Sequence, residues 1–460
     1  MGVSMTQERN IVVIGCGAGG GTAAQFARKT DRKANITIFE KGKYPQYSKC
    51  GIPYAISGII PKISDLVEFS EEWFKKAKIN LLLKTTVEKI DIDNQIVFAK
   101  KGNDVIEKPY SSLIISTGAK PFISLIENVG VEGVFVVRTI DDAEKISSFV
   151  RKGGNATIVG AGLIGIEIAD NLRKKGMKIT VLEVLPGILA NTLDEDMAEI
   201  VAEQIPDDVN VLTNHLAVKV ESTSGKISKV IIKNKESGEE KTIDTDLLVI
   251  AAGTKPDVDL AKSIGCKIGE TGGVVVNKRC ETSVKDVYAV GDCTEFLDFI
   301  TAKPSLVGLG SVVVRQGVAS GVNVAGGNYE LLKGVLNTST SEFFGVEIAV
   351  VGSTTKRVEK VFSIVTGRFN GFSLPDYYPG GKPISVKILV DKYTGMIIGA
   401  QAVGDNAAQH VNTLACAILG KLDVETLRRL ETAYAPPIAP TLDAVTLVCD
   451  IVSMKLSRKR

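Results

Sequence analysis

Two glycine-rich turns with the same spacing recur in the sequence, and their composition suits phosphate binding. The first glycine turn is Gly15-Cys16-Gly17-Ala18-Gly19-Gly20, and the second is Gly160-Ala161-Gly162-Leu163-Ile164-Gly165. Glycine at the first, third and sixth positions permits a tight turn and lets the backbone approach a pyrophosphate closely. A helix that begins there directs unpaired N–H groups and a partial positive charge at the phosphates. The glycines expected to contact a cofactor are Gly15, Gly17 and Gly20 in the first turn and Gly160, Gly162 and Gly165 in the second.

A carboxylate follows each glycine turn. Glu40 ends an apolar run over residues 36–39, and Glu183 ends another over residues 179–182. An acidic residue about 20 positions after such a turn accepts hydrogen bonds from the hydroxyls of a ribose. Because a carboxylate at this position repels a 2′-phosphate, Glu183 favours NADH over NADPH.

The segments around the glycine turns must place them at the ends of strands. Apolar runs over residues 11–14 and 156–159 predict buried strands that lead into the two turns. Helix-like stretches follow over residues 22–29 and up to residue 175. One glycine turn is a weak signal, but two complete strand–turn–helix–strand frames predict an α/β fold with two Rossmann-like dinucleotide-binding domains. Further strand ends carry candidate cofactor contacts at Thr117-Gly118, at Gly253 and at Gly291-Asp292.

The composition of the chain excludes several classes of protein. Its 460 residues suggest about three domains. Lys and Arg number 55 against 53 Asp and Glu, so the net charge of +2 gives no reason to expect nucleic-acid binding. Seven scattered cysteines and two distant histidines form neither a disulfide framework nor a zinc motif. No apolar run approaches the ~20 residues that cross a bilayer, so we expect no membrane partner. Together with the charge and the cysteine pattern, this leads us to expect a cytoplasmic protein with no metal site and no nucleic-acid partner.

The sequence changes character from about residue 335. Apolar residues between 384 and 390 mostly alternate with polar ones, which predicts a strand. A turn-like segment over residues 391–395 leads to a partner strand over residues 396–403. Residues 411–422 then place apolar side chains at helical spacing. This α+β module has no glycine turn of its own, and we expect it to serve packing or dimerisation.

The two glycine turns, Ser116-Thr117-Gly118 and Gly291-Asp292 together resemble the pyridine nucleotide–disulfide oxidoreductases, over essentially the whole chain. The resemblance implies that the first glycine turn binds FAD and that the second binds NADH or NADPH. It implies that Asp292 binds the ribityl chain of the flavin, that Glu167 lies near the contact of the nicotinamide with the flavin, and that the chain forms a homodimer. The implied domains are an FAD-binding domain over 1–121 and 257–330, an NAD(P)-binding domain over 122–256 and a dimerisation domain over 331–460.

Cys50 narrows this resemblance. Family members such as glutathione reductase carry two cysteines five positions apart, but here position 55 is Ala55. Cys50-Gly51-Ile52-Pro53-Tyr54 instead resembles the single-cysteine motif of coenzyme A disulfide reductases, NADH oxidases and NADH peroxidases, although Gln46 replaces their usual serine. The oxidised form of a lone Cys50 is then a mixed disulfide with a small thiol, a persulfide or a sulfenic acid.

Two tyrosine segments of the C-terminal module extend the resemblance. Asp376-Tyr377-Tyr378-Pro379-Gly380 and Ala433-Tyr434-Ala435-Pro436-Pro437 are similar to segments that coenzyme A disulfide reductases supply from the partner subunit. This similarity implies catalytic roles for Tyr378 and Tyr434 beside Cys50. It favours the reduction of coenzyme A disulfide, polysulfide or a related sulfur compound. The phosphates of a bound coenzyme A need cations, for which the candidates are Arg28, Lys43 and Lys49.

Two other activities stay open at this point. Oxidases and peroxidases of the single-cysteine subgroup place a histidine in the first glycine turn, where this chain has Ala18. Reduced flavin nevertheless reacts with oxygen without a cysteine, so an NADH oxidase that forms peroxide or water is one alternative. The other is a flavin reductase for a small electron-carrier protein, which gives Cys50 no special role.

Overall fold

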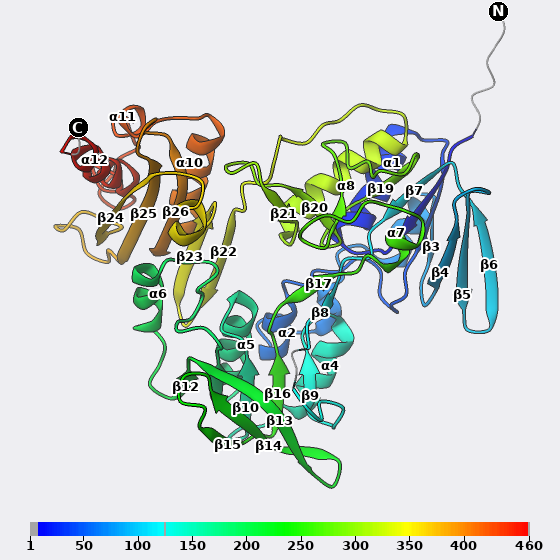
Figure 1. Ribbon diagram of the computed structural model, residues 1–460, viewed down its shortest axis with the longest axis horizontal. Coiled ribbons are helices and arrows are strands. Elements are labelled where there is room, and N and C mark those ends of the chain that lie inside the picture. The colour runs from blue at the N-terminus through cyan, green and yellow to red at the C-terminus, as the bar shows by residue number, and fades with distance from the viewer. Residues whose placement is uncertain (1–7, 124–125, 459–460) are drawn as a thin grey trace, which may run out of the picture. The chain divides into compact units, whose positions relative to one another are not determined.

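The computed structural model describes residues 8–123 and 126–458 (Figure 1). The chain forms two compact units, each built from two stretches of sequence. Unit 1 contains Met1–Phe122 and Thr254–Val335, and unit 2 contains Ile123–Gly253 and Leu336–Arg460. Unit 1 therefore includes the region predicted to bind FAD, and unit 2 includes the regions predicted for NAD(P) binding and for dimerisation.

Unit 1 is organised around a parallel sheet with the strand order β19-β7-β1-β2-β3. Its strands read as continuous apolar runs because both faces of the sheet are covered. Strand β1 is the predicted run that leads into the first glycine turn, and its four apolar residues are buried. The strands are β1 (Asn10–Ile14), β2 (Asn35–Phe39), β3 (Ile79–Leu82), β7 (Ser112–Ile115) and β19 (Val287–Ala289).

Two helices of unit 1 lie side by side, α1 (Ala18–Thr30) and α8 (Gly310–Val324) (Figure 1). Gly317 and Gly321 of α8 face α1, because a Cβ on either glycine would crowd the backbone oxygens of α1. Without side chains at these two positions the helix backbones approach closely. This packing fixes α1, and with it the N-terminal end that follows the first glycine turn.

Shorter elements complete unit 1. Strands β4, β5 and β6 form an antiparallel sheet, β8 pairs with β17, and β18, β20 and β21 form a third small sheet. The strands are β4 (Thr86–Asp91), β5 (Ile96–Lys101), β6 (Asp104–Pro109), β8 (Ala119–Pro121), β17 (Thr254–Pro256), β18 (Val274–Val275), β20 (Thr294–Leu297) and β21 (Pro304–Leu306). The helices are α2 (Ile52–Ser57), η1 (Ile63–Leu66), α3 (Glu71–Lys76) and α7 (Asp259–Ser263).

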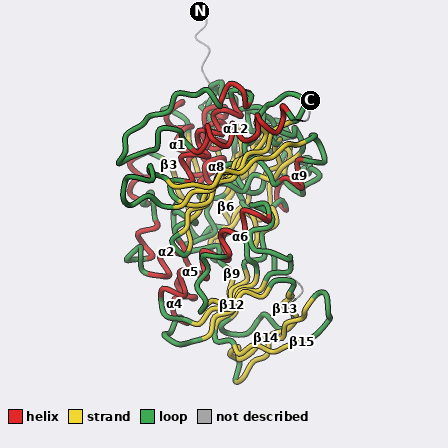
Figure 2. Tube along the Cα trace, turned by 90° about the vertical axis from the view of Figure 1, so that its left-hand side faces the viewer, coloured by secondary structure: helices red, strands yellow, loops and turns green. Residues whose placement is uncertain are grey.

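Unit 2 contains a second parallel sheet, with the strand order β12-β11-β10-β16-β9. Strands β13, β14 and β15 form a separate antiparallel sheet, seen together in Figure 2. The strands are β9 (Val134–Val136), β10 (Asn155–Val159), β11 (Lys178–Leu182), β12 (Val209–Leu212), β13 (His215–Thr223), β14 (Lys226–Asn234), β15 (Glu240–Asp244) and β16 (Leu247–Ile250). The helices are α4 (Ile140–Phe149), α5 (Leu163–Lys174) and α6 (Glu195–Ala202).

The C-terminal module of unit 2 is an antiparallel sheet with the order β22-β23-β26-β25-β24, against which α10 and α12 pack. The strands are β22 (Ser339–Phe343), β23 (Val346–Val351), β24 (Ile364–Phe372), β25 (Pro383–Asp391) and β26 (Ile397–Gly404). The helices are α9 (Thr355–Val358), α10 (Ala407–Leu419), α11 (Val424–Leu427) and α12 (Ala444–Ser457). The predicted fold, two Rossmann-like domains plus an α+β module, is thereby confirmed.

The strand predicted from residues 384–390 is present as β25, and its polar positions are buried along with its apolar ones. Ser385 and Lys387, which occupy the polar positions of β25, are each 8% exposed. Lys387 is buried because its ammonium contacts Asp194 and Asp196, at the start of α6. Among the described residues, no helix has both the length and the apolar character that a membrane-spanning segment needs.

Candidate active site

The first glycine turn lies between β1 and α1 and leaves room for a ligand on one side. Gly15 has a φ of +98°, and a Cβ there would overlap the carbonyl oxygen of Ser116. A Cβ on Gly20 would overlap the carbonyl oxygen of Gly15, so the turn tolerates no side chain at either position. A Cβ on Gly17, in contrast, would meet nothing within 4 Å. The turn is therefore tightly packed at its ends and open in its middle, as the backbone approach of a pyrophosphate requires.

The second glycine turn repeats this arrangement between β10 and α5. Gly160 has a φ of +105°, and a Cβ there would crowd the carbonyl oxygen of Ala251. A Cβ on Gly165 would overlap the carbonyl oxygen of Gly160, whereas a Cβ on Gly162 would again meet nothing within 4 Å. Both turns thus fit a dinucleotide, and each is followed by a helix of more than ten residues whose N-terminal N–H groups suit its phosphates.

The two carboxylates predicted to bind ribose form equivalent hydrogen bonds. Glu40 accepts the N–H of Cys16 at 2.7 Å and the N–H of Gly42 at 2.7 Å. Glu183 accepts the N–H of Ala161 at 2.7 Å and the N–H of Leu185 at 2.9 Å. An ionised carboxylate offers about four acceptor positions, so each keeps two for ribose hydroxyls. Each acid therefore also ties its glycine turn to the strand that follows, a role that spacing alone does not predict.

The other predicted cofactor contacts lie at strand ends of their own units. In unit 1, the hydroxyl of Thr117 donates to the carbonyl of Asp257 at 2.5 Å, and Gly118 has a φ of +73°. Gly291 has a φ of +86°, its N–H donates to Gln316 at 2.8 Å, and Asp292 beside it is half-buried. In unit 2, Gly253 has a φ of +110°. Positive φ values at these glycines explain why other residues are disfavoured there.

Cys50 is an exposed thiol immediately before α2. Gly51 is the N-cap of this helix, and a Cβ on Gly51 would overlap the side chain of Leu66. The residues before Cys50 are fixed by backbone hydrogen bonds, since Ser48 N donates to Leu66 O at 2.8 Å and Glu68 N donates to Gln46 O at 3.0 Å. Cys50 is therefore a solvent-accessible sulfur on an ordered segment of unit 1.

Gln46 connects the Cys50 segment to the helix of the first glycine turn. Its side chain is 3% exposed, and its Nε2 donates to Glu68 at 3.2 Å. Its Oε1 is buried without a hydrogen-bond partner among the described residues, and a Cβ on Gly21 of α1 would overlap this oxygen. The sequence marks Gln46 only as a departure from a usual serine and does not predict its packing against Gly21.

The remaining cysteines differ from Cys50 in exposure. Burial raises the pKa of Cys293 to about 11 and that of Cys449 to about 12. Burial likewise raises the pKa of Cys16, Cys266 and Cys280. These five buried thiols resist forming the reactive thiolate. The other exposed cysteine is Cys416, on α10 of unit 2.

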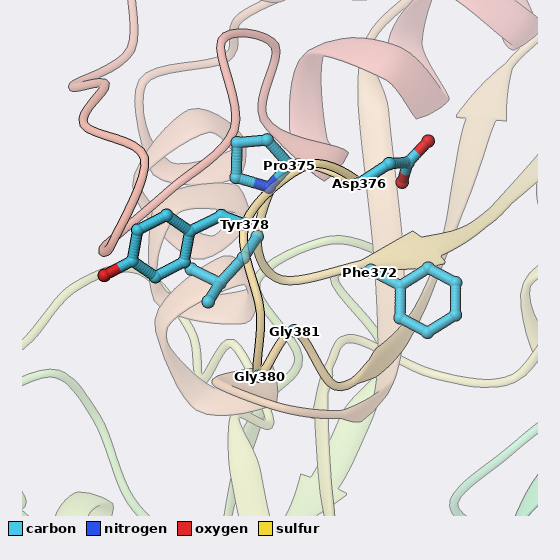
Figure 3. A pocket seen from close by; sticks show the side chains of 7 residues that line it. Phe372, Pro375, Asp376, Tyr378, Gly380 and Gly381 are labelled. Atoms are coloured by element: carbon cyan, nitrogen blue, oxygen red, sulfur yellow. The ribbon is translucent and has the colours of Figure 1, made fainter.

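The two tyrosine segments approach each other in the C-terminal module. The hydroxyls of Tyr377 and Tyr434 are 2.7 Å apart, and the two side chains are 70% and 48% exposed. The hydrogen bond with Tyr434 raises the pKa of Tyr377 above its usual value. Tyr378, the residue predicted from the first segment, instead lines a cavity of about 230 Å³, with Phe372 on the opposite side (Figure 3). The structure thus brings Tyr377 into contact with Tyr434, and the catalytic role of Tyr378 stays a prediction.

Arg28, proposed from the sequence as a phosphate contact, has a different environment. Its guanidinium donates to the carbonyl oxygens of Ala77 at 3.0 Å and Lys78 at 2.7 Å, as well as to those of Asp31 and Arg32. These four bonds tie α1 to the end of α3 and engage four of the five N–H donors of the guanidinium. Arg28 therefore has a structural role, and Lys43 and Lys49 stay the other candidates for the phosphates.

Glu167, predicted to lie near the nicotinamide, is half-buried on α5 and its carboxyl group contacts the hydroxyl of Ser341 on β22. Burial raises the pKa of Glu167, and the hydrogen bond from Ser341 opposes that shift. Ser341 is a contact that sequence reasoning missed, because 174 residues separate the two positions.

Comparison with known proteins extends this description to the whole chain. The family model described as pyridine nucleotide-disulphide oxidoreductase matches residues 9–317, and the model of the dimerisation domain of that family matches residues 338–445. An NADH oxidase of Methanocaldococcus jannaschii is 36% identical, over 97% of this chain and 99% of that protein. A coenzyme A-dependent NAD(P)H sulfur oxidoreductase of Pyrococcus furiosus is 32% identical, over 97% of this chain and 99% of that protein.

A solved structure agrees with these relatives. The NAD-dependent persulfide reductase from A. fulgidus superposes with a TM-score of 0.93 at 33% identity, and the match covers 98% of this chain and 84% of that one. This chain contains two glycine turns that fit dinucleotides, an exposed cysteine in the same unit as the first turn, and a C-terminal module that matches the dimerisation model. The chain thus belongs to the pyridine nucleotide-disulfide oxidoreductase family and is an FAD-dependent NAD(P)H:disulfide oxidoreductase.

Proposed function

We propose that this enzyme reduces coenzyme A disulfide, polysulfide or a related sulfur compound, with Cys50 as its single redox-active cysteine. The exposure of Cys50 carries the proposal, because a sulfur that attacks a substrate from solution must be accessible. The four other cysteines in the described part of unit 1 are buried and have raised pKa values, namely Cys16, Cys266, Cys280 and Cys293. The coenzyme A-dependent sulfur reductase among the relatives supports the same substrate class.

The chemistry of Cys50 is a thiol–disulfide exchange. Its thiolate attacks one sulfur of the substrate disulfide, so that a bond from Cys50 to that sulfur forms, the substrate S–S bond breaks, and one thiolate leaves. FAD held at the first glycine turn would supply the mixed disulfide on Cys50 with two electrons that come from NAD(P)H. That bond then breaks, the second thiol leaves, and the Cys50 thiolate is restored. One disulfide, one NAD(P)H and one proton yield two thiols and NAD(P)⁺.

A leaving thiolate needs a proton, and the tyrosine pair is the proposed source. Tyr434 and Tyr377 share a hydrogen bond, and this bond raises the pKa of Tyr377 above its usual value. Tyr434 takes the catalytic role and Tyr377 orients it, while Tyr378 lines the neighbouring cavity. We infer a homodimer in which the tyrosines of one subunit serve Cys50 of the other, in agreement with the dimerisation model that matches residues 338–445.

The central experiment measures NADH and NADPH consumption without oxygen, with coenzyme A disulfide and with polysulfide. Cys50→Ser is expected to lower turnover with the true substrate by about a thousandfold or more, because the nucleophile is lost. Cys416→Ser is the matched control, since Cys416 is also exposed but lies on α10, and it is expected to retain activity. Full turnover of Cys50→Ser with both substrates contradicts the proposal.

Oxygen reduction is the second candidate function, supported by the M. jannaschii relative that is named an NADH oxidase. Ala18 opens α1 where oxidases of the single-cysteine subgroup carry a histidine, so the first glycine turn supplies no acid–base group for peroxide. Reduction of oxygen by two electrons of NADH then ends at hydrogen peroxide. Oxygen uptake and peroxide release are expected in a one-to-one ratio, and water as the product instead requires Cys50 to reduce peroxide.

A further inference from the structure

A hydrogen bond joins the nucleotide-binding region of unit 2 to its C-terminal module. Glu167 belongs to α5, the helix that begins at the second glycine turn, and Ser341 belongs to β22 of the C-terminal sheet. The hydroxyl of Ser341 contacts Oε1 of Glu167, and α5 packs against β22 around this contact. Ser341 is 9% exposed, so the pair lies at the inner side of this packing.

The environment of Glu167 leaves Ser341 as the group that orients its carboxyl. Burial raises the pKa of Glu167, and the hydrogen bond from Ser341 acts to lower it. Neither effect comes from a charged neighbour. The elements packed against α5 are β10, β11 and β22, whose ionisable residues are Lys178 at the start of β11 and Glu342, which is exposed on β22. In the described part of the chain, Oε2 of Glu167 has no hydrogen-bond partner.

The position of Glu167 relates this carboxyl to the bound dinucleotide. It follows Gly165 by two residues, within the first turns of α5, where Gly162 and Ile164 are exposed. We propose that Ser341 is a positioning residue for Glu167, which fixes one carboxyl oxygen so that the other accepts a hydrogen bond from the carboxamide of the nicotinamide. This inference rests on the proposed role of Glu167 at the nicotinamide and deepens it, because it assigns part of nicotinamide recognition to the C-terminal module.

The test compares two ligands that share everything except the nicotinamide. Dissociation constants of NAD⁺ and of ADP-ribose are measured by calorimetry on the oxidised holoenzyme, for the wild type, Ser341→Ala and Ser341→Thr. Ser341→Ala is expected to weaken NAD⁺ binding about three- to tenfold, the equivalent of one hydrogen bond, and to leave ADP-ribose binding unchanged. Ser341→Thr retains a hydroxyl and is expected to restore NAD⁺ binding.

A double-mutant cycle tests whether Ser341 acts through Glu167. In the Glu167→Ala background, Ser341→Ala is expected to cause no further loss of NAD⁺ affinity, because the group that it positions is gone. Ser339→Ala, the same substitution two residues earlier on the same face of β22, controls for a general effect on the strand. Thermal unfolding of all variants shows whether a loss of affinity follows from loss of folded protein.

The outcomes separate this inference from the proposed function. Equal losses for NAD⁺ and ADP-ribose in Ser341→Ala, or additive losses in the double mutant, overturn the positioning role. If Glu167→Ala itself leaves NAD⁺ binding unchanged, the assignment of Glu167 to the nicotinamide is wrong and the inference falls with it. If Ser341→Ala behaves as expected but Cys50→Ser keeps full turnover with sulfur substrates, the proposed function fails while the positioning role stands.

Discussion

The carboxylate of Glu183 holds the second glycine turn and is also placed to bind a ribose. These two roles predict the effect of Glu183→Gln, which replaces the carboxylate with a neutral amide. The carboxylate accepts N–H groups from Ala161 and Leu185 and offers its remaining acceptor positions to a ribose. In Glu183→Gln one of these backbone N–H groups faces an amide NH₂, which cannot accept a hydrogen bond. The negative charge that repels a 2′-phosphate is also lost.

Steady-state kinetics with both coenzymes test this dual role of Glu183. We expect Glu183→Gln to raise the KM for NADH about tenfold and to raise the ratio of kcat/KM for NADPH to that for NADH. Glu40→Gln is the matched control, because Glu40 makes the same two bonds in the first glycine turn. It is expected to weaken FAD retention and leave the coenzyme ratio unchanged, and an unchanged ratio in Glu183→Gln contradicts the assignment.

Gln46 and Gly21 pack against each other. The effect of Gly21→Ala on the stability of the protein is therefore expected to change sign when Gln46 is replaced. A Cβ on Gly21 overlaps the buried Oε1 of Gln46, so Gly21→Ala is expected to destabilise the wild type by about 1–3 kcal/mol through overpacking. With Gln46→Ser the obstacle is removed. Gly21→Ala then stabilises by about 0.5–1 kcal/mol, because alanine is the better helix former. Thermal unfolding of the holoenzyme in this four-member cycle measures both signs, and a destabilising Gly21→Ala in both backgrounds contradicts the pairing.

At the scale of elements, a buried ion pair joins β25 to the start of α6 within unit 2. Lys387 contacts Asp194 at 2.8 Å and Asp196 at 2.6 Å, and the side chains of Lys387 and Asp194 are 10% and 9% exposed. Thr355 also donates its N–H to Asp194 at 2.8 Å. Burial acts to raise the pKa of Asp194, but the hydrogen bonds from Lys387 and Thr355 outweigh it and hold the pKa below its usual value.

This lowered pKa of Asp194 predicts how the stability of the protein depends on pH. A carboxyl whose pKa is lower in the folded state contributes stability above its unfolded pKa, at about 3.9, and loses that contribution as the pH falls through the folded value. Lys387→Met leaves Asp194 buried without its cation and is expected to cost about 3–5 kcal/mol at pH 7. Lys387→Met combined with Asp194→Asn is expected to recover part of that loss. Denaturant unfolding between pH 7 and pH 3 tests this, and a cost for Lys387→Met that does not shrink towards acid contradicts the ion pair.

The features that could be predicted from the sequence are those that depend on the spacing of residues within one short segment. Spacing alone located both glycine turns, Glu40 and Glu183, because such turns need glycine at fixed positions. Contacts between distant segments were not predictable in this way, as Ser341 with Glu167 and Gly21 with Gln46 show. The neighbours Tyr377 and Tyr378 carry the same side chain, so only the path of the backbone decides which of them contacts Tyr434. The burial of Lys387 could not be predicted from its own strand, because the carboxylates that pair with it belong to another segment.

At the scale of the whole molecule, the C-terminal module exposes large apolar side chains beside Tyr434. Ile438 is 74% exposed and Leu442 is 56% exposed, and both follow Tyr434 closely in the sequence. Exposed apolar side chains of this size suit an interface with a second copy of the chain. The proposed homodimer therefore predicts that substitutions of Ile438 and Leu442 to aspartate give monomers, which light scattering detects, and that these monomers lose sulfur reduction while both nucleotide sites persist.

Mixed dimers decide whether Tyr434 serves Cys50 across the subunit interface. A subunit with Cys50→Ser and a subunit with Tyr434→Phe are co-expressed with different affinity tags, and two successive purifications keep only the heterodimer. If each active site combines residues of two subunits, one of the two sites of the heterodimer has both Cys50 and Tyr434 intact. The heterodimer is then expected to reach about half of wild-type turnover. If Cys50 and Tyr434 of the same subunit act together, no site is intact and the turnover does not exceed that of Tyr434→Phe. A wild-type heterodimer carrying the same two tags sets the reference, so an activity at the level of Tyr434→Phe rejects the shared site.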